Sequence, residues 1–439
     1  MITCHPSKPL YLLDPMEWAD PEQLSALQLQ RLRHTLYNAW DRILPFQKAC
    51  QRAAIHPDDL QTLPDLAHFP FISKNDLRLH YPNGLFAVPM ERILRLHTSS
   101  GQTGTPTITG YTRTDLEIWT RLMARSLRTA GVRQGMRVQV SFGYGPFTGG
   151  LGAHYGAEAL GCTVIPASGG NTRRQIHFIQ DLKPDIIMAT PSYMLVIADE
   201  MERQGINPRK SSMKMGILGA EPWTEEMRCA IEERFDLKAI DIYGLSEIMG
   251  PGVAIESPNS RGSLHIWEDY FYPEIIDPDT GAVLPDGSFG ELVLTTLTRE
   301  AMPLIRYRTH DLTRLLPGTG RGLRRMERTA GRSDAMLTIQ GVKVLPTQVE
   351  AIILRDPRLA PVYQLVIRRK GHKDYLEIKT ELRSGLHDKD VQTAARTDLA
   401  HCIKRTLGVP AKITIAHENT IERSSGKARR IIDLRPTQH

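Results

Sequence analysis

Short apolar segments alternate with amphipathic segments of helical length in the middle of this chain. The apolar segments span residues 138–142, 162–165, 185–189, 215–218 and 239–243. Helical patterns separate them, near 151–160, 172–182 and 224–235, with a further one after 189. Strands that are apolar throughout belong to parallel sheets with helices on both faces. We therefore predict an α/β domain built around a parallel sheet.

The segments before and after this alternation have other patterns. Residues 15–80 predict helices and loops, with Ser73 capping one helix. Residues 252–331 hold turn sequences such as Asp-Pro-Asp-Thr-Gly between short strands, which predicts a mostly β subdomain. A chain of 439 residues is too long for one core, and we place residues 1–331 in one large domain.

The last part of the chain reads as a compact unit of its own. A helix is expected near 346, a hairpin over 363–381, a helix over 389–407 and a strand over 412–416. These elements suffice for a small α+β domain. We therefore predict a second domain over residues 332–439.

Composition restricts the setting in which the chain works. No apolar run approaches the roughly 18–20 residues that span a bilayer, and the first residues lack the pattern of a signal peptide. Five scattered cysteines form no CxxC pair, which indicates reduced thiols. We expect a cytoplasmic protein without membrane association.

The positive charge is concentrated near the C-terminus. Of the net charge of +6, the residues from 332 onward contribute an excess, with 20 Lys and Arg against 12 Asp and Glu. Such a segment can bind nucleic acid or a polyphosphate cofactor. Because no nucleic-acid motif accompanies it, we favour the cofactor and expect no nucleic-acid partner.

Small hydroxyl residues and glycines dominate residues 96–107, Leu-His-Thr-Ser-Ser-Gly-Gln-Thr-Gly-Thr-Pro-Thr. Such a segment offers backbone N–H groups and hydroxyls to phosphate oxygens. It lacks the Gly-Lys-Ser/Thr of a P-loop, and alone it is more typical of a plain surface loop. The candidate phosphate-binding residues are Ser99, Ser100, Gly101, Thr103 and Gly104.

Four further segments follow in order. Residues 241–247, Asp-Ile-Tyr-Gly-Leu-Ser-Glu, close a predicted strand, where ligands bind in open parallel sheets. An aromatic ring there can stack on a base, and a carboxylate can hold Mg²⁺. Residues 305–311 end on an aspartate that can accept ribose hydroxyls, and residues 331–344 and the basic segment 423–430 complete the series.

Together, these segments resemble the motifs of the adenylate-forming superfamily, which includes acyl-CoA synthetases, luciferases and peptide-synthetase adenylation domains. The likeness runs from about Leu96 to Asp433. Within the superfamily the chain is most similar to phenylacetate–coenzyme A ligases, on residues 142–152, 219–224, 243–252 and 264–269.

The resemblance implies a reaction in two steps. ATP and an aryl acid of phenylacetate type give an acyl-adenylate and pyrophosphate. The small domain then rotates, and coenzyme A displaces AMP. The implied cofactors are ATP, Mg²⁺ and coenzyme A, the implied setting is aromatic acid metabolism, including phenylacetate catabolism, and a homodimer is compatible with the family.

The resemblance also assigns roles to particular residues. Lys427 contacts the carboxylate and the α-phosphate, Glu247 holds Mg²⁺, and Asp334 is the hinge between the domains. The residues assigned to ATP or AMP are Ser99, Ser100, Gly101, Thr103, Gly104, Ala220, Glu221, Pro222, Asp241, Ile242, Tyr243, Gly244, Ser246, Asp311, Arg332 and Lys343. Those assigned to the aryl-acid pocket are Tyr144, Phe147, Gly219, Ala220, Gly250 and Pro251.

Each assignment has a simpler structural alternative. Lys427 can belong to a solvated basic tail, Glu247 can be a carboxylate at a helix start, Asp311 can serve a turn, and Tyr243 can be a core aromatic at a strand end. The aromatic residues of the acid pocket can equally be ordinary packing, and the hinge aspartate an ordinary loop residue.

Some positions depart from the family pattern. Gln102 stands where Thr is usual, Ala335 replaces an acidic residue, and Gln340 and Lys343 replace Arg and Asn. Ser257 and Thr313 stand where some relatives have zinc-binding cysteines, so we expect no zinc. Two alternatives therefore stay open: an enzyme of secondary metabolism that passes the acyl group to an amine or carrier protein, and a non-catalytic paralogue. Products formed with and without coenzyme A distinguish the former, and pyrophosphate release the latter.

Overall fold

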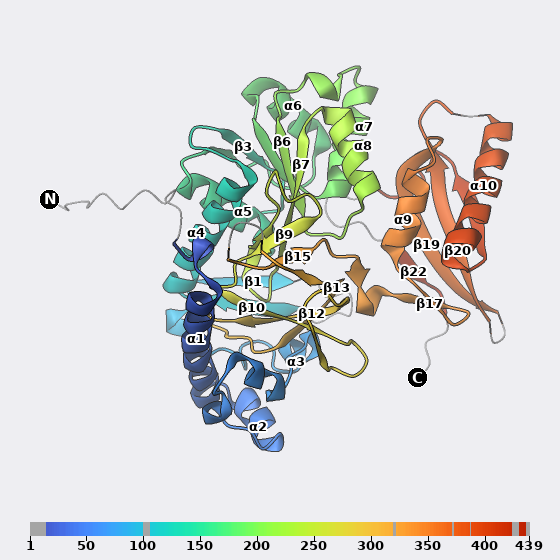
Figure 1. Ribbon diagram of the computed structural model, residues 1–439. Helices are drawn as coiled ribbons and strands as arrows, with labels where there is room; N and C mark the ends of the chain where they lie inside the picture. Colours follow the sequence, from blue (N-terminus) through green and yellow to red (C-terminus); the bar gives the residue numbers. More distant parts are fainter. Residues whose placement is uncertain are drawn as a thin grey trace. The chain divides into compact units, whose positions relative to one another are not determined.

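The computed structural model describes residues 15–99, 106–318, 322–370, 373–386, 388–423 and 430–435 (Figure 1). Tertiary contacts divide the chain into two compact units. The first unit comprises Met1–Ser168, Pro184–Met188 and Ile240–Arg328, and the second comprises Gly169–Lys183, Ala189–Ala239 and Thr329–His439. Each unit is therefore assembled from segments that lie far apart in the sequence.

Helices form the beginning of the first unit, as predicted for residues 15–80. Asp20 caps α1, and Ser73 caps α3, where its hydroxyl accepts from the Asp76 N–H and the Asp76 carboxylate accepts from the Ser73 N–H. The predicted Ser73 cap is thus confirmed. The helices are α1 Pro21–Arg42, α2 Leu44–Arg52 and α3 Lys74–Leu79, with 3₁₀ turns at Pro15–Trp18, Pro57–Asp59, Leu63–His68 and Met90–Arg92.

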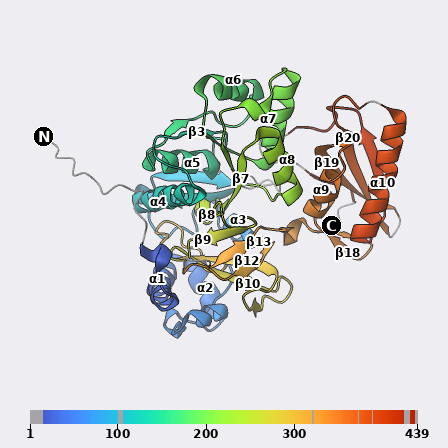
Figure 2. The same cartoon turned by 45° about the horizontal axis from the view of Figure 1, so that its top comes forward.

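The predicted parallel strands of the first unit are present. β3 (Arg137–Val140) pairs in parallel with β4 (Thr163–Ile165) and with β5 (Ile186–Ala189). The helices α4 (Arg113–Ala130) and α5 (Thr148–Ala159) lie side by side (Figure 2). Small residues on α5 permit this contact, because a Cβ on Gly156 would lie 2.3 Å from the Met123 side chain.

Antiparallel strands also occur in this unit, beyond the parallel ones that the apolar pattern predicted. β8 pairs with β7 and with β9, and β15 joins β9 to β14. β1 and β2 pair in an antiparallel hairpin, with Arg95 opposite Tyr111 and Ser99 opposite Thr107. The bounds are β1 Arg95–Ser99, β2 Thr107–Tyr111, β7 Lys238–Leu245, β8 Gly250–Ile255, β9 Ser263–Ile266, β14 Leu315–Leu316 and β15 Arg325–Glu327.

The mostly β character predicted for residues 252–331 is confirmed by a second antiparallel sheet. In it β10 (Phe271–Ile276) pairs with β11 (Val283–Leu284) and β12 (Gly290–Thr296), and β12 pairs with β13 (Tyr307–Thr313). Arg308 on β13 forms an ion pair with the buried Glu291 of β12 at 2.7 Å. This ion pair links β12 to β13, the strand that also carries Asp311.

The second unit contains α6 (Thr172–Leu182), α7 (Pro191–Arg203), β6 (Met215–Gly219) and α8 (Glu225–Phe235). Its C-terminal part begins with short strands and continues into the predicted helix, hairpin, helix and strand. The bounds are β16 Gly331–Arg332, β17 Leu337–Ile339, β18 Val342–Val344, α9 Pro346–Leu354, β19 Leu359–Lys370, β20 Lys373–Leu382, α10 Lys389–Leu407, β21 Ala411–Ala416 and β22 Ile431–Asp433, with 3₁₀ turns at Pro208–Lys210 and Ser333–Ala335.

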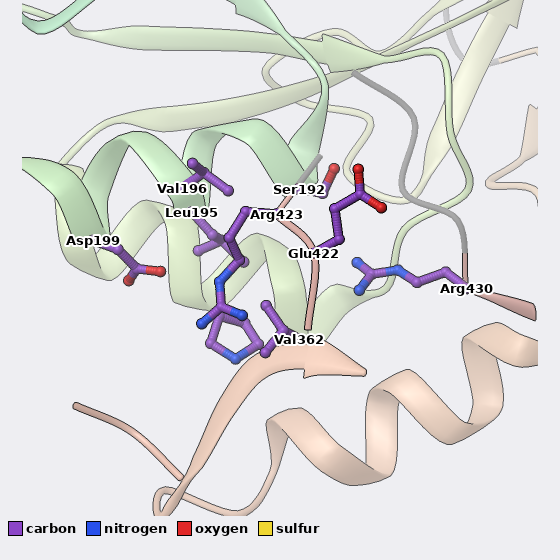
Figure 3. Close-up of a pocket in the computed structure, with 9 residues that line it drawn as sticks. Ser192, Leu195, Val196, Asp199, Val362, Glu422, Arg423 and Arg430 are labelled. Atoms are coloured by element: carbon purple, nitrogen blue, oxygen red, sulfur yellow. The ribbon is translucent and has the colours of Figure 1, made fainter. Parts of the chain in front are cut away.

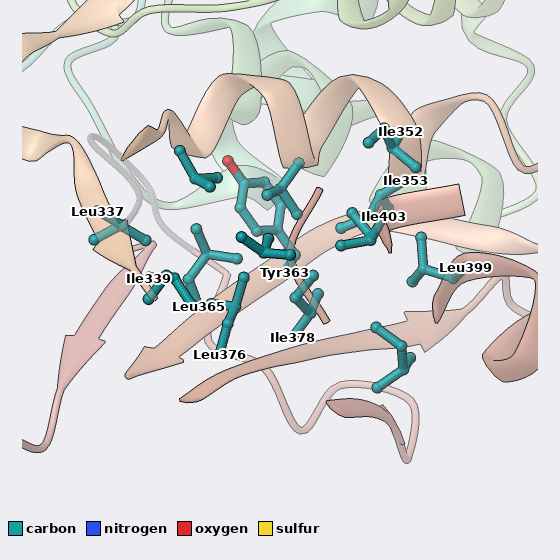
Figure 4. Close-up of a cluster of buried hydrophobic side chains, with 14 of the residues drawn as sticks. Leu337, Ile339, Ile352, Ile353, Tyr363, Leu365, Leu376, Ile378, Leu399 and Ile403 are labelled. Carbon is teal, nitrogen blue, oxygen red and sulfur yellow. The ribbon is translucent and has the colours of Figure 1, made fainter. Parts of the chain in front are cut away.

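A four-stranded sheet of order β21-β20-β19-β22 forms the centre of this C-terminal part. A cluster of buried apolar side chains joins one face of the sheet to α9 and α10; it includes Leu365 and Ile378 of the sheet and Ile403 of α10 (Figure 4). Each fully buried side chain of this kind contributes about 1.5–3 kcal/mol to folding. Among the described residues, no helix combines the length and apolar composition of a membrane span.

Candidate active site

A buried carboxylate follows strand β7 in the first unit. Glu247 is 5% exposed, and the Lys74 ammonium lies 3.1 Å from its Oε1. The Thr107 hydroxyl donates to the same oxygen at 3.4 Å, and Ser99 Oγ lies 2.5 Å from Thr107 Oγ1. The hairpin β1–β2 and the helix α3 thus bring a cation and two hydroxyls to Glu247.

The charge of Glu247 is maintained by these neighbours. Burial alone would raise the pKa of the carboxyl, but the Lys74 ammonium and hydrogen bonds, one of them from Ser99, outweigh it and lower the pKa below its usual value. Glu247 is therefore ionised at neutral pH. Lys74 is a site residue that sequence reasoning missed, although its position as first residue of a capped helix was visible.

Two of the predicted nucleotide-binding side chains contact each other directly. The Tyr243 hydroxyl on β7 donates to Asp311 Oδ2 on β13 at 2.6 Å. Asp241 precedes them on β7, largely buried, with its N–H donating to Glu256 Oε2. The structure thus joins the segments 241–247 and 305–311, which the sequence had linked only by order.

The close approach of β7 and β8 depends on glycine. A Cβ on Gly244 would lie 2.0 Å from the carbonyl oxygen of Gly250, and Gly250 itself has a φ of +108°. Two residues after Gly244, the Ser246 hydroxyl lies 2.9 Å from the Thr148 hydroxyl, oxygen to oxygen. Ile242 is buried within β7. The predicted residues at the end of β7 therefore determine how its backbone packs against β8.

The candidate acid-pocket residues of the first unit lie around the turn before α5. The Tyr144 hydroxyl is 3.1 Å from His154 Nδ1, and burial raises the pKa of Tyr144 above its usual value. Phe147 is 46% exposed, so its ring is available for contact with a ligand. Gly250 and Pro251 begin β8.

The second unit holds the predicted acid-pocket residues Gly219 and Ala220 and the predicted nucleotide-binding residues that begin at Ala220. Gly219 ends β6 and is buried, and Ala220 has a φ of +72°, a left-handed conformation that costs free energy for a residue with a Cβ. Glu221 Oε1 accepts a hydrogen bond from the Ser192 N–H at 2.7 Å, near the start of α7. Pro222 follows, partly exposed.

The predicted hinge carries an ion pair between near neighbours. Arg332 binds both carboxylate oxygens of Asp334, at 2.8 and 2.7 Å. Lys343 lies on the exposed strand β18. Residues 100–105, with Ser100, Gly101, Thr103 and Gly104, and residue Lys427 lie outside the described residues.

The described arginines on either side of residues 424–429 each contact a buried glutamate. Arg423 binds Glu381 through two oxygens, at 3.0 and 2.7 Å. Arg430 lies 3.4 Å from Glu350 and places its guanidinium over the Tyr363 ring at 4.4 Å. The two arginines also line a small cavity of about 20 Å³, large enough for one water molecule (Figure 3). Arg423 and Arg430 are therefore not part of a solvated tail.

The donor set at Glu247 fits a hard divalent cation. Mg²⁺ is bound through one or two carboxylates together with substrate phosphates, and its ligands are oxygens. Glu247 supplies an ionised carboxylate, with the Thr107 hydroxyl beside it. In the described part of the chain, no group of three or more His, Cys, Asp or Glu side chains is placed to hold a metal.

Comparison with known proteins defines the class. The family model named AMP-binding enzyme matches residues 139–297. The family model named AMP-binding enzyme C-terminal domain matches residues 341–435. A solved structure of 2-hydroxyisobutyryl-CoA ligase with a bound acyl-AMP is similar at a TM-score of 0.91 and 27% identity, over 97% of this chain and 95% of that one. The fold is that of an adenylate-forming CoA ligase.

Curated relatives narrow the class to a family. Phenylacetate-coenzyme A ligase of Aromatoleum evansii is 55% identical over 97% of this chain and 98% of its own length. The ligases of the same name from Pseudomonas putida and Escherichia coli are 53% and 51% identical, over 97% and 96% of this chain and 97% and 98% of their own lengths. The chain belongs to the phenylacetate–coenzyme A ligase family.

Proposed function

We propose that this protein activates phenylacetate, or a closely related arylacetate, with ATP and transfers the acyl group to coenzyme A, releasing AMP and pyrophosphate. The observation that carries the proposal is the identity of 55% to a phenylacetate-coenzyme A ligase over nearly the whole of both chains. The cluster around Glu247 and the contact between Tyr243 and Asp311 are consistent with it.

The nucleotide is held by charge and hydrogen bonding. Glu247 is the proposed ligand of Mg²⁺, which neutralises phosphate charge and polarises the α-phosphate when bound. Lys74 keeps the buried carboxylate ionised before the metal arrives. Ser99 and the hydroxyl and glycine residues after it bind phosphate oxygens, and the Tyr243 hydroxyl orients Asp311 toward the ribose.

The acid is activated because its own oxygen is a poor leaving group, whereas AMP is a good one. Lys427 is the proposed partner of the carboxylate and the α-phosphate during adenylation. Its neighbours Arg423 and Arg430 are each paired with a buried glutamate, which limits the freedom of the chain ends on both sides of the lysine. This pairing supports a positioned lysine.

The second step needs a new arrangement of groups around the adenylate. We place a mobile small domain at residues 332–439, with Asp334 as hinge, and propose that it withdraws Lys427 before the thiol of coenzyme A attacks the acyl carbon. The C–S bond forms as the bond from the acyl carbon to the phosphate oxygen breaks, and AMP leaves. In the described structure Arg332 binds Asp334, so this pair would have to break or rotate with the hinge.

The cellular setting follows from weaker observations. Cys50, Cys162, Cys229 and Cys402 are free, which supports a cytoplasmic location. A role in the breakdown of aromatic acids follows from the proposed substrate. A homodimer remains a proposal from the family resemblance.

The proposal is tested by pyrophosphate release with a panel of acids. Phenylacetate, substituted phenylacetates, indoleacetate, benzoate, octanoate and palmitate are each supplied with ATP and Mg²⁺. We expect phenylacetate-type acids to give the highest kcat/KM, because the relatives that share up to 55% of the sequence are phenylacetate-coenzyme A ligases. Octanoate or palmitate used ten times more efficiently than phenylacetate would refute the substrate class.

A further inference from the structure

Three aromatic rings form a buried group behind the candidate acid-pocket segments of the first unit. Tyr111 stacks on Trp119, with ring centroids 5.1 Å apart and planes at 18°. His97 meets both rings edge-on, at 5.5 and 5.8 Å. All three side chains are at most 2% exposed. We call this group, His97, Tyr111 and Trp119, the aromatic trio.

Each ring of the aromatic trio hydrogen-bonds the backbone, and the Tyr111 hydroxyl has two carbonyls within reach, since the oxygen of Ser246 also lies 3.4 Å from it. His97 Nδ1 lies 3.0 Å from the oxygen of Pro146, the Tyr111 hydroxyl donates to the oxygen of Met249 at 3.0 Å, and the Trp119 indole N–H donates to the oxygen of Pro251 at 3.0 Å. These carbonyls belong to the turn that ends at Phe147 and to the segment that contains Gly250. The three donors thus fix two segments of the chain that are distant in sequence and that we assign to the acid pocket.

The space behind Gly250 is filled by the trio as well. A Cβ on Gly250 would lie 2.4 Å from Trp119 Cζ2, and a Cβ on Gly152 would lie equally close to the same atom. The indole therefore has no room to move toward β8 or α5. Trp119 therefore packs against the backbone at Gly250, and the hydrogen bonds of the trio reach the carbonyls of Met249 and Pro251 on either side of this residue.

The hydrogen bond to Pro146 determines which ring nitrogen of His97 carries the proton. A carbonyl oxygen can only accept, so Nδ1 carries the proton and Nε2 holds a lone pair. Burial lowers the pKa of His97 below its usual value, although the bond to Pro146 opposes this shift. Nε2 has no partner among the described residues. The bond from Nδ1 to the Pro146 carbonyl thus orients the His97 ring toward the turn that ends at Phe147.

From these contacts we propose that the aromatic trio positions the acid-binding segments of the ligase and so determines its affinity for the aryl acid. The three residues touch the carbonyls behind the pocket and act through Phe147, Gly250 and Pro251. This inference rests on the proposed function and adds residues that set its specificity.

Single-donor substitutions test the proposal. Tyr111→Phe removes one hydroxyl and keeps the stack, and His97→Phe keeps a ring and removes the Nδ1 donor. His97→Asn restores a donor, because the amide nitrogen of Asn is as many bonds from the backbone as Nδ1. Tyr193→Phe is the matched control, since the buried Tyr193 hydroxyl also donates to a carbonyl, that of Gly170, in the second unit.

The readout is the KM for phenylacetate against the KM for ATP in the full-length enzyme. A lost hydrogen bond of about 1 kcal/mol corresponds to roughly a fivefold change. We expect Tyr111→Phe and His97→Phe to raise the KM for phenylacetate about five- to tenfold, with the KM for ATP within twofold. His97→Asn should return the KM for phenylacetate to within threefold of wild type, and the control should not change it.

Several results would overturn the inference. These are a fall in kcat at unchanged KM for phenylacetate, an equal rise in both KM values, or no recovery in His97→Asn. If a His97 variant does not fold, Tyr111→Phe decides alone. A wild-type enzyme inactive on every arylacetate would instead contradict the proposed function, so the two failures are distinguishable.

Discussion

Glu350 is a buried carboxyl whose ionisation should weaken the C-terminal part of the chain. It lies on α9, 4% exposed, and burial raises its pKa to about 7, against the opposing effect of Arg430 and with smaller contributions from Glu221 and Glu226. An ordinary glutamate in the unfolded chain titrates near 4.5. The folded chain therefore binds the proton more tightly than the unfolded chain does.

The sign and size of the effect follow from this difference. A raised pKa stabilises the folded state fully below about pH 4.5, and this stabilisation is lost as the pH rises through about 7. About 2.5 pKa units correspond to roughly 3 kcal/mol. The glutamine of Glu350→Gln cannot ionise. The free energy of unfolding of this variant, measured relative to that of wild type, should therefore increase by about 3 kcal/mol as the pH rises from 4.5 to 8.

Hydrogen–deuterium exchange measures the local stability of α9 and β19 in the variant and in wild type. Peptides from both elements are followed at pH 5 and pH 8, after correction for the intrinsic exchange rate. Glu418→Gln, which changes an exposed carboxyl of the same domain, is the control and should behave as wild type. A stability difference between Glu350→Gln and wild type that changes by less than about 1 kcal/mol over this range would refute the reasoning.

Three further changes test the proposed chemistry. Glu247→Gln should lower adenylation at least a hundredfold with the fold intact, because the amide can still accept from Lys74 while the metal loses several kcal/mol of charge stabilisation; near-normal pyrophosphate release by the folded variant contradicts this. Lys427→Ala should abolish adenylation but still convert supplied phenylacetyl-adenylate to the thioester, and equal loss of both steps would make it a general binding residue. Asp334→Pro should do the reverse, since a fixed φ hinders the hinge; unimpaired thioester formation would exclude that role.

Much of the architecture could be predicted because local patterns specify it. The apolar runs and capping residues locate the helices and strands of the centre to within a few residues, as α6 and β6 illustrate. Hairpin β19–β20 and helix α10 lie where the pattern placed them. Such elements depend on periodicity and caps, which are properties of neighbouring residues.

The contacts that build the site could not be read in the same way. Lys74 reaches Glu247 across 173 positions of sequence, and its own segment predicts only a helix start. Tyr111 and Trp119 look like core residues until their bonds to the carbonyls of Met249 and Pro251 are known. Which side chains contact each other depends on the tertiary fold. The order of the motifs in the sequence indicated only that they belong to one site and did not identify the contacting residues.

The central claim is tested most directly by identifying the products of one reaction. The full-length protein is incubated with phenylacetate, ATP and Mg²⁺, with and without coenzyme A, and the products are quantified by mass spectrometry. The account predicts one phenylacetyl-CoA, one AMP and one pyrophosphate per turnover with coenzyme A, and enzyme-bound phenylacetyl-adenylate without it. Formation of ADP and phosphate, or an acyl-adenylate that coenzyme A does not consume, would contradict it.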